Sequence, residues 1–292
     1  MEINYKEELK KNGWVLIKNF FDEDLCNELR NSAHLSAENG LAGADILSNK
    51  YLSNLFLNNK LINLLTDIIG QKPVYFGDST FQIASLAGGI QNGFHKDCVD
   101  RKNSSGIDWE DDYSIIRIGI YLQDHKNYSE GLVVRDKSHK SSNLSIGKKI
   151  NVPSKPGDLV IWFLTTTHAG NAKRIKIIDY PVLMSNDESS KLSRKLYHKL
   201  PKSFIMPSQK DRIAIFATFG KDDRHLKRYI NYLKYRLYMV KILKKINFDQ
   251  DVVSKINSNN NLSIIDLKLE AEKIDEDNFV EYDFNRFQDF KI

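Results

Sequence analysis

The chain has 292 residues, of which 41% are hydrophobic and 28% charged, proportions that exclude a disordered or fibrous protein. Its length allows a sizeable core, arranged either as one domain with extensions or as two domains. The formal net charge of +5 is modest for this length and does not by itself indicate a nucleic-acid partner.

Cysteine content and the first residues indicate the compartment. Only Cys26 and Cys98 are present, without the CxxC spacing that holds zinc or an iron–sulfur cluster. Residues 1–8 are polar and acidic where a secretory signal needs an apolar segment. The longest apolar run, residues 159–164, is too short to span a bilayer. The sequence therefore predicts a cytoplasmic protein that is at most peripheral to a membrane.

The N-terminal region is predicted to form a strand followed by two helices. Residues 14–17 are a β-branched apolar run that favours a strand. Asp22 is placed to cap the helix that follows. A second helix is expected over residues 53–69, where Gly70 would end it.

Short β-rich segments dominate the chain from about residue 73 to residue 219. Turn residues separate them, and so many short strands predict a jelly roll, or double-stranded β-helix, with flanking helices. The expected strands are residues 74–76, 81–83, 115–122, 131–134, 159–164 and 213–219. Two polar inserts interrupt them, residues 100–112 and residues 179–210, the second with a short helix near residues 191–199.

The strand pattern stops after Gly220, so residues 1–220 are predicted as the core domain and residues 221–292 as a C-terminal extension. A helix is expected over residues 223–246, followed by an acidic tail. At about 100° per residue its basic side chains share one face, opposite an apolar face. The basic residues are Arg224, Lys227, Arg228, Lys234, Lys241 and Lys245. This face either stays solvated while the helix packs on the core or on a second subunit, or it contacts anionic lipid or a polyanionic substrate.

Two histidines and one aspartate carry the predicted chemistry. His95 and Asp97 are two residues apart in an extended segment, so their side chains point the same way. His168 follows 73 residues after His95, behind the most apolar strand. Two imidazoles and one carboxylate hold Fe(II) on one face of an octahedron and leave three positions for a 2-oxo acid and dioxygen.

Three segments around these residues resemble the phytanoyl-CoA dioxygenase family, in the same order. They are residues 13–22 (GWVLIKNFFD), residues 129–140 (SEGLVVRDKSHK) and residues 156–171, from PGDLVIW to HAGN. The resemblance covers roughly residues 10–220. It implies a double-stranded β-helix, Fe(II), 2-oxoglutarate and dioxygen as cosubstrates, and hydroxylation of an unactivated C–H bond. Halogenases of this lineage lose the ligand carboxylate, so the presence of Asp97 argues for hydroxylation.

The resemblance also implies an arginine that anchors the distal carboxylate of 2-oxoglutarate, because a buried carboxylate needs a charged partner. Arg212 opens the matching strand, and Arg174 is the alternative. Gln82 is a further candidate to point toward the cosubstrate. Gly170 stands where relatives often carry a hydroxyl, so one cosubstrate contact is expected to be missing.

Several other residues are candidates or have simpler explanations. Trp109 in the first insert and Arg117 on a strand are the candidates for substrate contact, and the insert itself is a candidate lid. Arg117 has the alternative of pairing with an acid outside. Simpler roles are expected elsewhere: packing for Cys98 and Trp162, a turn hydrogen bond for His139, and solvation for His34, His125, His198 and His225.

The sequence thus predicts an Fe(II)- and 2-oxoglutarate-dependent hydroxylase. Its substrate would be a small molecule or a sugar of an anionic cell-surface glycolipid such as lipopolysaccharide core, and no nucleic-acid signature accompanies the charge. Two other classes of protein stay open: a non-catalytic jelly-roll binding protein, and an adaptor that uses the C-terminal helix at a membrane surface or in a homo-oligomer.

Overall fold

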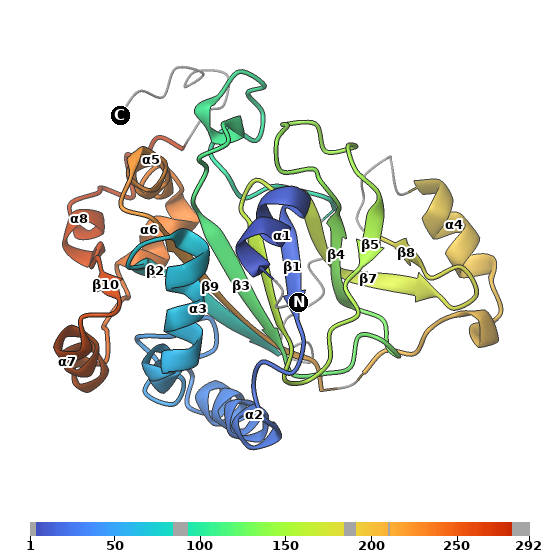
Figure 1. Cartoon of the computed structure of the whole chain (residues 1–292), viewed down its shortest axis with the longest axis horizontal. Coiled ribbons are helices and arrows are strands. Elements are labelled where there is room, and N and C mark those ends of the chain that lie inside the picture. Colours follow the sequence, from blue (N-terminus) through green and yellow to red (C-terminus); the bar gives the residue numbers. More distant parts are fainter. Residues whose placement is uncertain (1–3, 84–92, 184–190, 210, 282–292) are drawn as a thin grey trace.

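Two facing sheets form the centre of the protein (Figure 1). The structure is a computed structural model and describes residues 4–83, 93–183, 191–209 and 211–281. In spatial order, the larger sheet contains β1 (Trp14–Ile17), β6 (Leu159–Phe163), β3 (Ile116–Tyr121), β9 (Ile213–Gly220), β2 (Val74–Ile83) and β10 (Ser263–Ile264). The smaller sheet contains β5 (Lys149–Asn151), β4 (Gly131–Arg135), β7 (His168–Ile175) and β8 (Tyr180–Val182). Neighbouring strands are antiparallel, except that β10 runs parallel to β2.

Apolar side chains from both sheets meet between them. Tyr121 and Trp162 of the larger sheet pack with Leu132 and Val134 of the smaller one, and all four are buried. A larger core lies on the other face of the large sheet, beneath the N-terminal helices (Figure 1). Burial on both faces explains why the central strands read as continuous apolar runs rather than alternating ones. The architecture is the predicted jelly roll with flanking helices.

The N-terminal helices begin and end at the residues that cap them. They are α1 (Tyr5–Asn12), α2 (Glu23–Glu38) and α3 (Asn59–Ile69). Asp22 accepts a hydrogen bond from the Leu25 amide at 2.8 Å, and Gly70 ends α3 in the left-handed conformation. The helix predicted over residues 53–69 is instead a 3₁₀ turn, Ser53–Leu57, followed by α3, because Asn58 caps a new start. Helix α1 was not predicted.

Strand β2 joins two segments that the sequence suggested were separate strands. Its pairing with β9 shifts between Tyr75 and Ser79, which is a β-bulge. Gly77 lies in this bulge with a φ of +82°, and a Cβ there would come 2.4 Å from the Ile246 side chain. The bulge brings Asp78 to the wall of the cavity described below.

The C-terminal residues form α5 (Arg224–Leu233), α6 (Leu237–Leu243), α7 (Gln250–Asn259) and α8 (Lys268–Glu272). The single helix predicted over residues 223–246 is therefore wrong, since it breaks between α5 and α6. The apolar face is buried as expected, at Leu226, Leu233 and Val240 among others.

The continuous basic face predicted for this region is also wrong. Acidic residues of the following segment neutralise its lysines: Lys234 lies 2.6 Å from Glu270, and Lys241 lies 3.9 Å from Glu276. Arg228 is not at the surface at all, being 4% exposed. Consequently the six predicted basic residues do not form one continuous cationic stripe.

The described residues of both predicted inserts contact the rest of the fold. The insert after β8 contains α4 (Lys191–Lys199), as expected, and a 3₁₀ turn, Lys202–Phe204. In the insert at residues 100–112, Asp100 and Asp108 are buried and bind Arg228. These ion pairs hold the insert against α5, so it does not have the mobility expected of a lid. Among the described residues, no helix is long and apolar enough to cross a bilayer.

Candidate metal centre

The His-x-Asp segment lies along the beginning of β7. His95 and His168 exchange two backbone hydrogen bonds, each 3.0 Å long, and the Asp97 amide donates to the Leu164 carbonyl at 3.0 Å. In such an extended segment alternate side chains share a face. Lys96 accordingly points to the other side, where its Nζ donates to the Ser138 carbonyl at 2.8 Å and to a second carbonyl.

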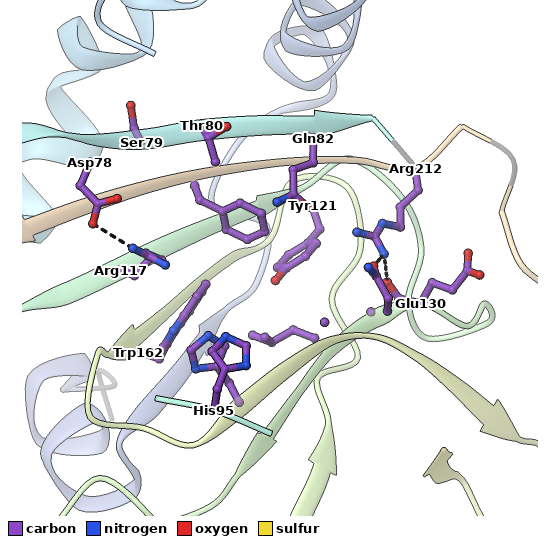
Figure 2. Close-up of a pocket in the computed structure, with 16 residues that line it drawn as sticks. Asp78, Ser79, Thr80, Gln82, His95, Arg117, Tyr121, Glu130, Trp162 and Arg212 are labelled. Carbon is purple, nitrogen blue, oxygen red and sulfur yellow. Dashed lines mark hydrogen bonds and ion pairs between the residues drawn. The ribbon is translucent and has the colours of Figure 1, made fainter. Parts of the chain in front are cut away.

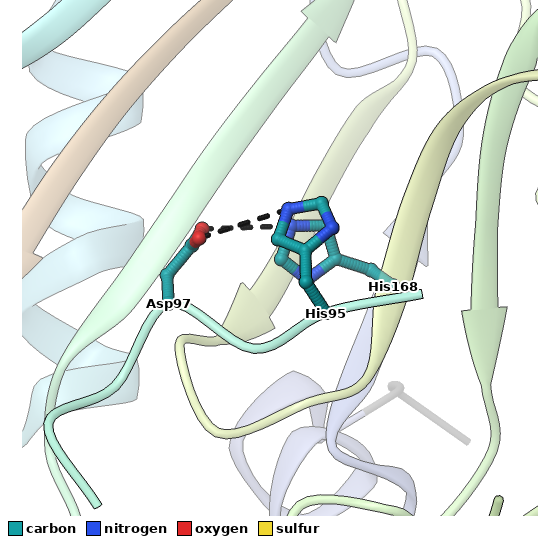
Figure 3. A group of neighbouring side chains, drawn as sticks. All are labelled: His95, Asp97 and His168. Atoms are coloured by element: carbon teal, nitrogen blue, oxygen red, sulfur yellow. Dashed lines mark ion pairs between the residues drawn. The ribbon is translucent and has the colours of Figure 1, made fainter. Parts of the chain in front are cut away.

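This pairing brings the three predicted ligands together (Figure 3). Asp97 Oδ1 lies 3.7 Å from His95 Nε2, and Asp97 Oδ2 lies 3.5 Å from His168 Nε2. One donor atom from each residue falls within 4.8 Å of the others, close enough for a single ion to bind all three. The arrangement has two nitrogen donors and one oxygen donor on one side, as a facial iron site requires.

Backbone carbonyls fix the orientation of both imidazoles. The Nδ1 atom of His95 donates to the Gly93 carbonyl at 2.9 Å, and Nδ1 of His168 donates to the Thr166 carbonyl at 3.0 Å. Because Nδ1 carries the proton in each ring, the Nε2 lone pair is free to face an ion. Burial, followed by the charge of His95, lowers the pKa of His168 to about 4, so this imidazole is neutral near pH 7.

Arg117 of β3 links the candidate ligand Asp97 to a second acid. Its guanidinium donates to Asp97 Oδ2 at 2.7 Å and to Thr218 Oγ1 at 3.0 Å. It also donates to Asp78 Oδ2 at 2.9 Å (Figure 2). Burial alone would raise the pKa of Asp97, but the charge of Arg117, followed by the nearby imidazoles, holds it well below its usual range. Arg117 therefore keeps this carboxylate ionised and oriented.

A cavity of about 210 Å³ is lined by His95 and His168 of the candidate metal centre. It is smaller than the roughly 300–1,000 Å³ typical of pockets that enclose drug-sized ligands, so it suits a small cosubstrate. Figure 2 shows the phenol of Tyr121 and the guanidinium of Arg212 directed into it from the larger sheet. Residues around it include Gln82, Arg117, Tyr121, Glu130, Gly170 and Arg212.

Arg212 is a buried cation that lacks an anionic partner within the described part of the chain. It is 6% exposed, and its Nη1 donates to the Glu130 carbonyl at 2.7 Å and to the Asn171 side chain. Its Nε is buried without a hydrogen-bond acceptor. Burial lowers the pKa of this guanidinium. A buried cation with an unused donor fits an incoming carboxylate.

Arg174, the alternative anchor, is already occupied. Its guanidinium pairs with Asp179 and with the carbonyls of His125 and Lys126, and it does not line the cavity. Of the two arginines, Arg212 lines the cavity and Arg174 does not. Gly170 lies at the cavity wall, and a Cβ added there would have no atom within 4 Å. The site therefore has space for the hydroxyl side chain that relatives often carry.

Trp109 does not lie where the sequence suggested. Its indole N–H donates to the Asn103 carbonyl at 2.7 Å, its ring packs against the main core, and it does not line the cavity. His139 is closer to expectation, since Nε2 bonds to the Lys10 carbonyl. The sequence analysis missed Asp78 and Tyr121, because their position at the cavity depends on strand pairing and on the bulge in β2.

Two histidines expected to be solvated are instead buried. His125 accepts from the Gln123 amide at 2.9 Å and donates to Ser154 Oγ at 3.1 Å. His225 bonds to Asp112 at 3.0 Å. Both predictions failed because one partner of each ring, Ser154 for His125 and Asp112 for His225, comes from a distant segment.

Comparison with solved structures identifies the fold. No family model matches the chain, and no curated protein is similar enough to count as a match. Solved structures do match, among them the non-haem α-ketoglutarate (2-oxoglutarate)-dependent epimerase SnoN from nogalamycin biosynthesis, with 13% identity, a TM-score of 0.50, and coverage of 74% of this chain and 80% of that one. EctD from S. alaskensis, solved with 2-oxoglutarate and 5-hydroxyectoine, is 11% identical with a TM-score of 0.51 over 75% and 76% of the two chains. The non-haem monooxygenase ThoJ, solved with nickel, is 12% identical with a TM-score of 0.50 over 75% and 77%.

At these identities the likeness shows the fold alone. The fold is the jelly roll shared by non-haem iron, 2-oxoglutarate-dependent enzymes. Within it, this chain carries His95, Asp97 and His168 as one group able to hold a metal ion. No comparison identifies the phytanoyl-CoA dioxygenase family, so that closer assignment stays a prediction.

Proposed function

We propose that this protein is an Fe(II)- and 2-oxoglutarate-dependent dioxygenase that hydroxylates an unactivated C–H bond. One observation carries the proposal: the two histidines of the His95, Asp97 and His168 group line the same cavity as Arg212, a buried arginine that has no acidic partner among the described residues. A metal ion and a small dicarboxylate would satisfy these two features together.

The residues present fit both groups. His95, Asp97 and His168 would hold the iron, with their donor atoms already oriented by the Gly93 and Thr166 carbonyls and by Arg117. When bound, the iron would supply the oxidising chemistry by activating dioxygen with 2-oxoglutarate as the electron source.

The distal carboxylate of 2-oxoglutarate would pair with Arg212, whose Nε is free to donate. Tyr121 and Gln82 would line the same end of the cavity. Trp162, which packs between the sheets and is 1% exposed, would exclude water from the side of His168, at a ring separation of 5.6 Å.

A small molecule or a glycan is the proposed substrate. The polar side chains of Thr80, Gln82 and Glu130 at the cavity suit a hydroxylated or polar compound. A sugar of an anionic glycolipid such as lipopolysaccharide core stays within this class. However, the basic helix that suggested it is neutralised, so that version no longer draws support from the C-terminal region.

Metal binding and turnover can be tested on the purified apoprotein. Under anaerobic conditions Fe(II) at about 100 times its Kd should stabilise the fold by about 2.7 kcal/mol. On addition of air, 2-oxoglutarate should be converted to succinate. His168→Ala should abolish both effects, while His34→Ala, a histidine outside the site, should keep both. Stabilisation without succinate would favour a non-catalytic binding protein, and equal behaviour of the two variants would refute the proposed site.

The anchor can be tested separately with a matched pair of arginine variants. Arg212→Gln should raise the 2-oxoglutarate concentration for half-maximal turnover by at least tenfold, since a charge-assisted hydrogen bond contributes about 1.5–3 kcal/mol. Arg174→Gln, after its fold is checked by circular dichroism, should change this concentration less than threefold. The reverse order would make Arg174 the anchor.

A further inference from the structure

Exposed apolar side chains concentrate on one part of the molecule, the hairpin of β7 and β8 together with the insert that follows it. Of thirteen large hydrophobic residues that are exposed in the described chain, six fall between residues 177 and 204. The most exposed are Leu192 at 81%, Ile177 at 72% and Ile178 at 65%. Clusters of exposed apolar residues usually mark an interaction site. We name this cluster the insert surface: Ile177, Ile178, Tyr180, Leu192, Leu196 and Phe204.

Backbone contacts hold the parts of the insert surface together. The Lys176 amide donates to the Phe204 carbonyl at 2.9 Å, which sets the 3₁₀ turn beside the tip of the hairpin. Helix α4 contacts β8. Leu192 and Leu196 are four residues apart on α4 and therefore share one side of it. Figure 1 shows hairpin and α4 at the edge of the smaller sheet, away from the N-terminal and C-terminal helices.

Lysines accompany these apolar residues. Lys176, Lys195, Lys199 and Lys202 are all exposed, and none has an acidic partner among the described residues. The acid nearest in the hairpin, Asp179, is taken by Arg174. This contrasts with the C-terminal helices, where Lys234, Lys241 and Lys244 pair with acidic residues.

We propose that the insert surface docks the protein on an anionic lipid surface. The apolar side chains would insert at the boundary of the acyl chains, and the unpaired lysines beside them would contact the anionic headgroups. A second copy of the chain fits less well, because a symmetric contact would place the same lysines opposite one another. The proposal is independent of the iron chemistry, since no candidate metal ligand belongs to this surface.

Vesicle flotation of the full chain tests the proposal. The protein should float with phosphatidylcholine vesicles containing about a third phosphatidylglycerol and stay in solution with pure phosphatidylcholine. Because exposed charges are screened over about 8–10 Å at physiological salt, binding should weaken as salt is raised. The His168→Ala variant should bind as well as the wild type, which separates this result from failure of the proposed function.

Two double variants locate the surface. Lys195→Glu/Lys199→Glu and Leu192→Ser/Leu196→Ser should each lower vesicle binding at least tenfold. All four positions are exposed, so the fold should survive, as thermal melts can show. The matched control, Lys241→Glu/Lys245→Glu on the C-terminal side, should bind like the wild type.

Three outcomes would overturn the proposal: equal binding to neutral and anionic vesicles, loss of binding in the control instead of the insert variants, or no vesicle binding. Light scattering distinguishes the alternative occupant. If the wild type is a dimer and Leu192→Ser/Leu196→Ser is a monomer, without vesicle binding by either, the insert surface is an interface between copies.

Discussion

Replacing Arg228 by methionine should destabilise the protein severely, although the residue lies outside the candidate metal centre. Its guanidinium binds Asp100 at 2.5 and 2.6 Å and Asp108 at 3.1 Å. All three side chains are at most 4% exposed. Methionine fills a similar space but leaves two carboxylates in the interior without their main cation.

The magnitude follows from the unpaired charges. Breaking a buried ion pair by removing one partner costs about 3–5 kcal/mol, compared with up to about 1 kcal/mol for an exposed pair. At about 2–4 °C per kcal/mol, the midpoint of thermal unfolding should fall on the order of 10 °C. Since Asp100 is three residues after Asp97, the candidate metal centre should also bind Fe(II) more weakly.

Calorimetry and urea unfolding of three variants provide the assay. Lys227→Met is the control, because Lys227 is the preceding residue on α5 but is exposed and lies 3.8 Å from its partner Asp222. It should change stability by less than about 0.5 kcal/mol. Adding Asp100→Asn and Asp108→Asn to Arg228→Met should restore part of the loss by removing the stranded charges. If the free energy of unfolding of Arg228→Met lies within about 1 kcal/mol of the wild-type value, the buried ion pairs do not hold this insert in place.

Three further predictions concern single residues. Burial, followed by the charges of Arg212 and Arg174, lowers the pKa of His125 to about 3. An unfolded histidine titrates near 6.5, so the folded state binds fewer protons below that pH. His125 should therefore contribute about 2 kcal/mol to the loss of stability between pH 7.5 and pH 5, in addition to the contribution of the buried His168, and His125→Asn should reduce the loss measured by urea unfolding by about that amount. Trp109→Ala should lower the free energy of unfolding by about 1–3 kcal/mol but leave kcat/KM within threefold of the wild-type value. A tenfold loss of kcat/KM would indicate that Trp109 contacts the substrate after all. Gly170→Ser places a hydroxyl in open space and should lower the half-saturating 2-oxoglutarate concentration several-fold. The free energy of unfolding should change by less than about 0.5 kcal/mol. An unchanged half-saturating concentration would show that the cosubstrate does not approach this wall of the cavity.

The sequence by itself determined the features that depend on neighbouring residues. The spacing of His95 and Asp97 predicted that their side chains share a face, because alternation along an extended segment is a local property. Asp22 and Gly70 marked helix boundaries for the same reason, since a cap bonds only the adjacent turn. Apolar runs located the central strands, which are buried on both faces.

The tertiary structure decided everything that needs a partner far along the chain. Strand β7 reads HAGNAKRI, a polar sequence that becomes a strand only because β4 and β8 pair with it. Arg174 pairs with Asp179 whereas Arg212 lines the cavity, a difference that depends on distant segments and that favours Arg212 in the proposed function. The basic stripe disappeared because acids some 35 residues later fold back onto it. Local spacing fixes where a side chain points, but pairing of charges and strands is settled by which distant segments burial brings together.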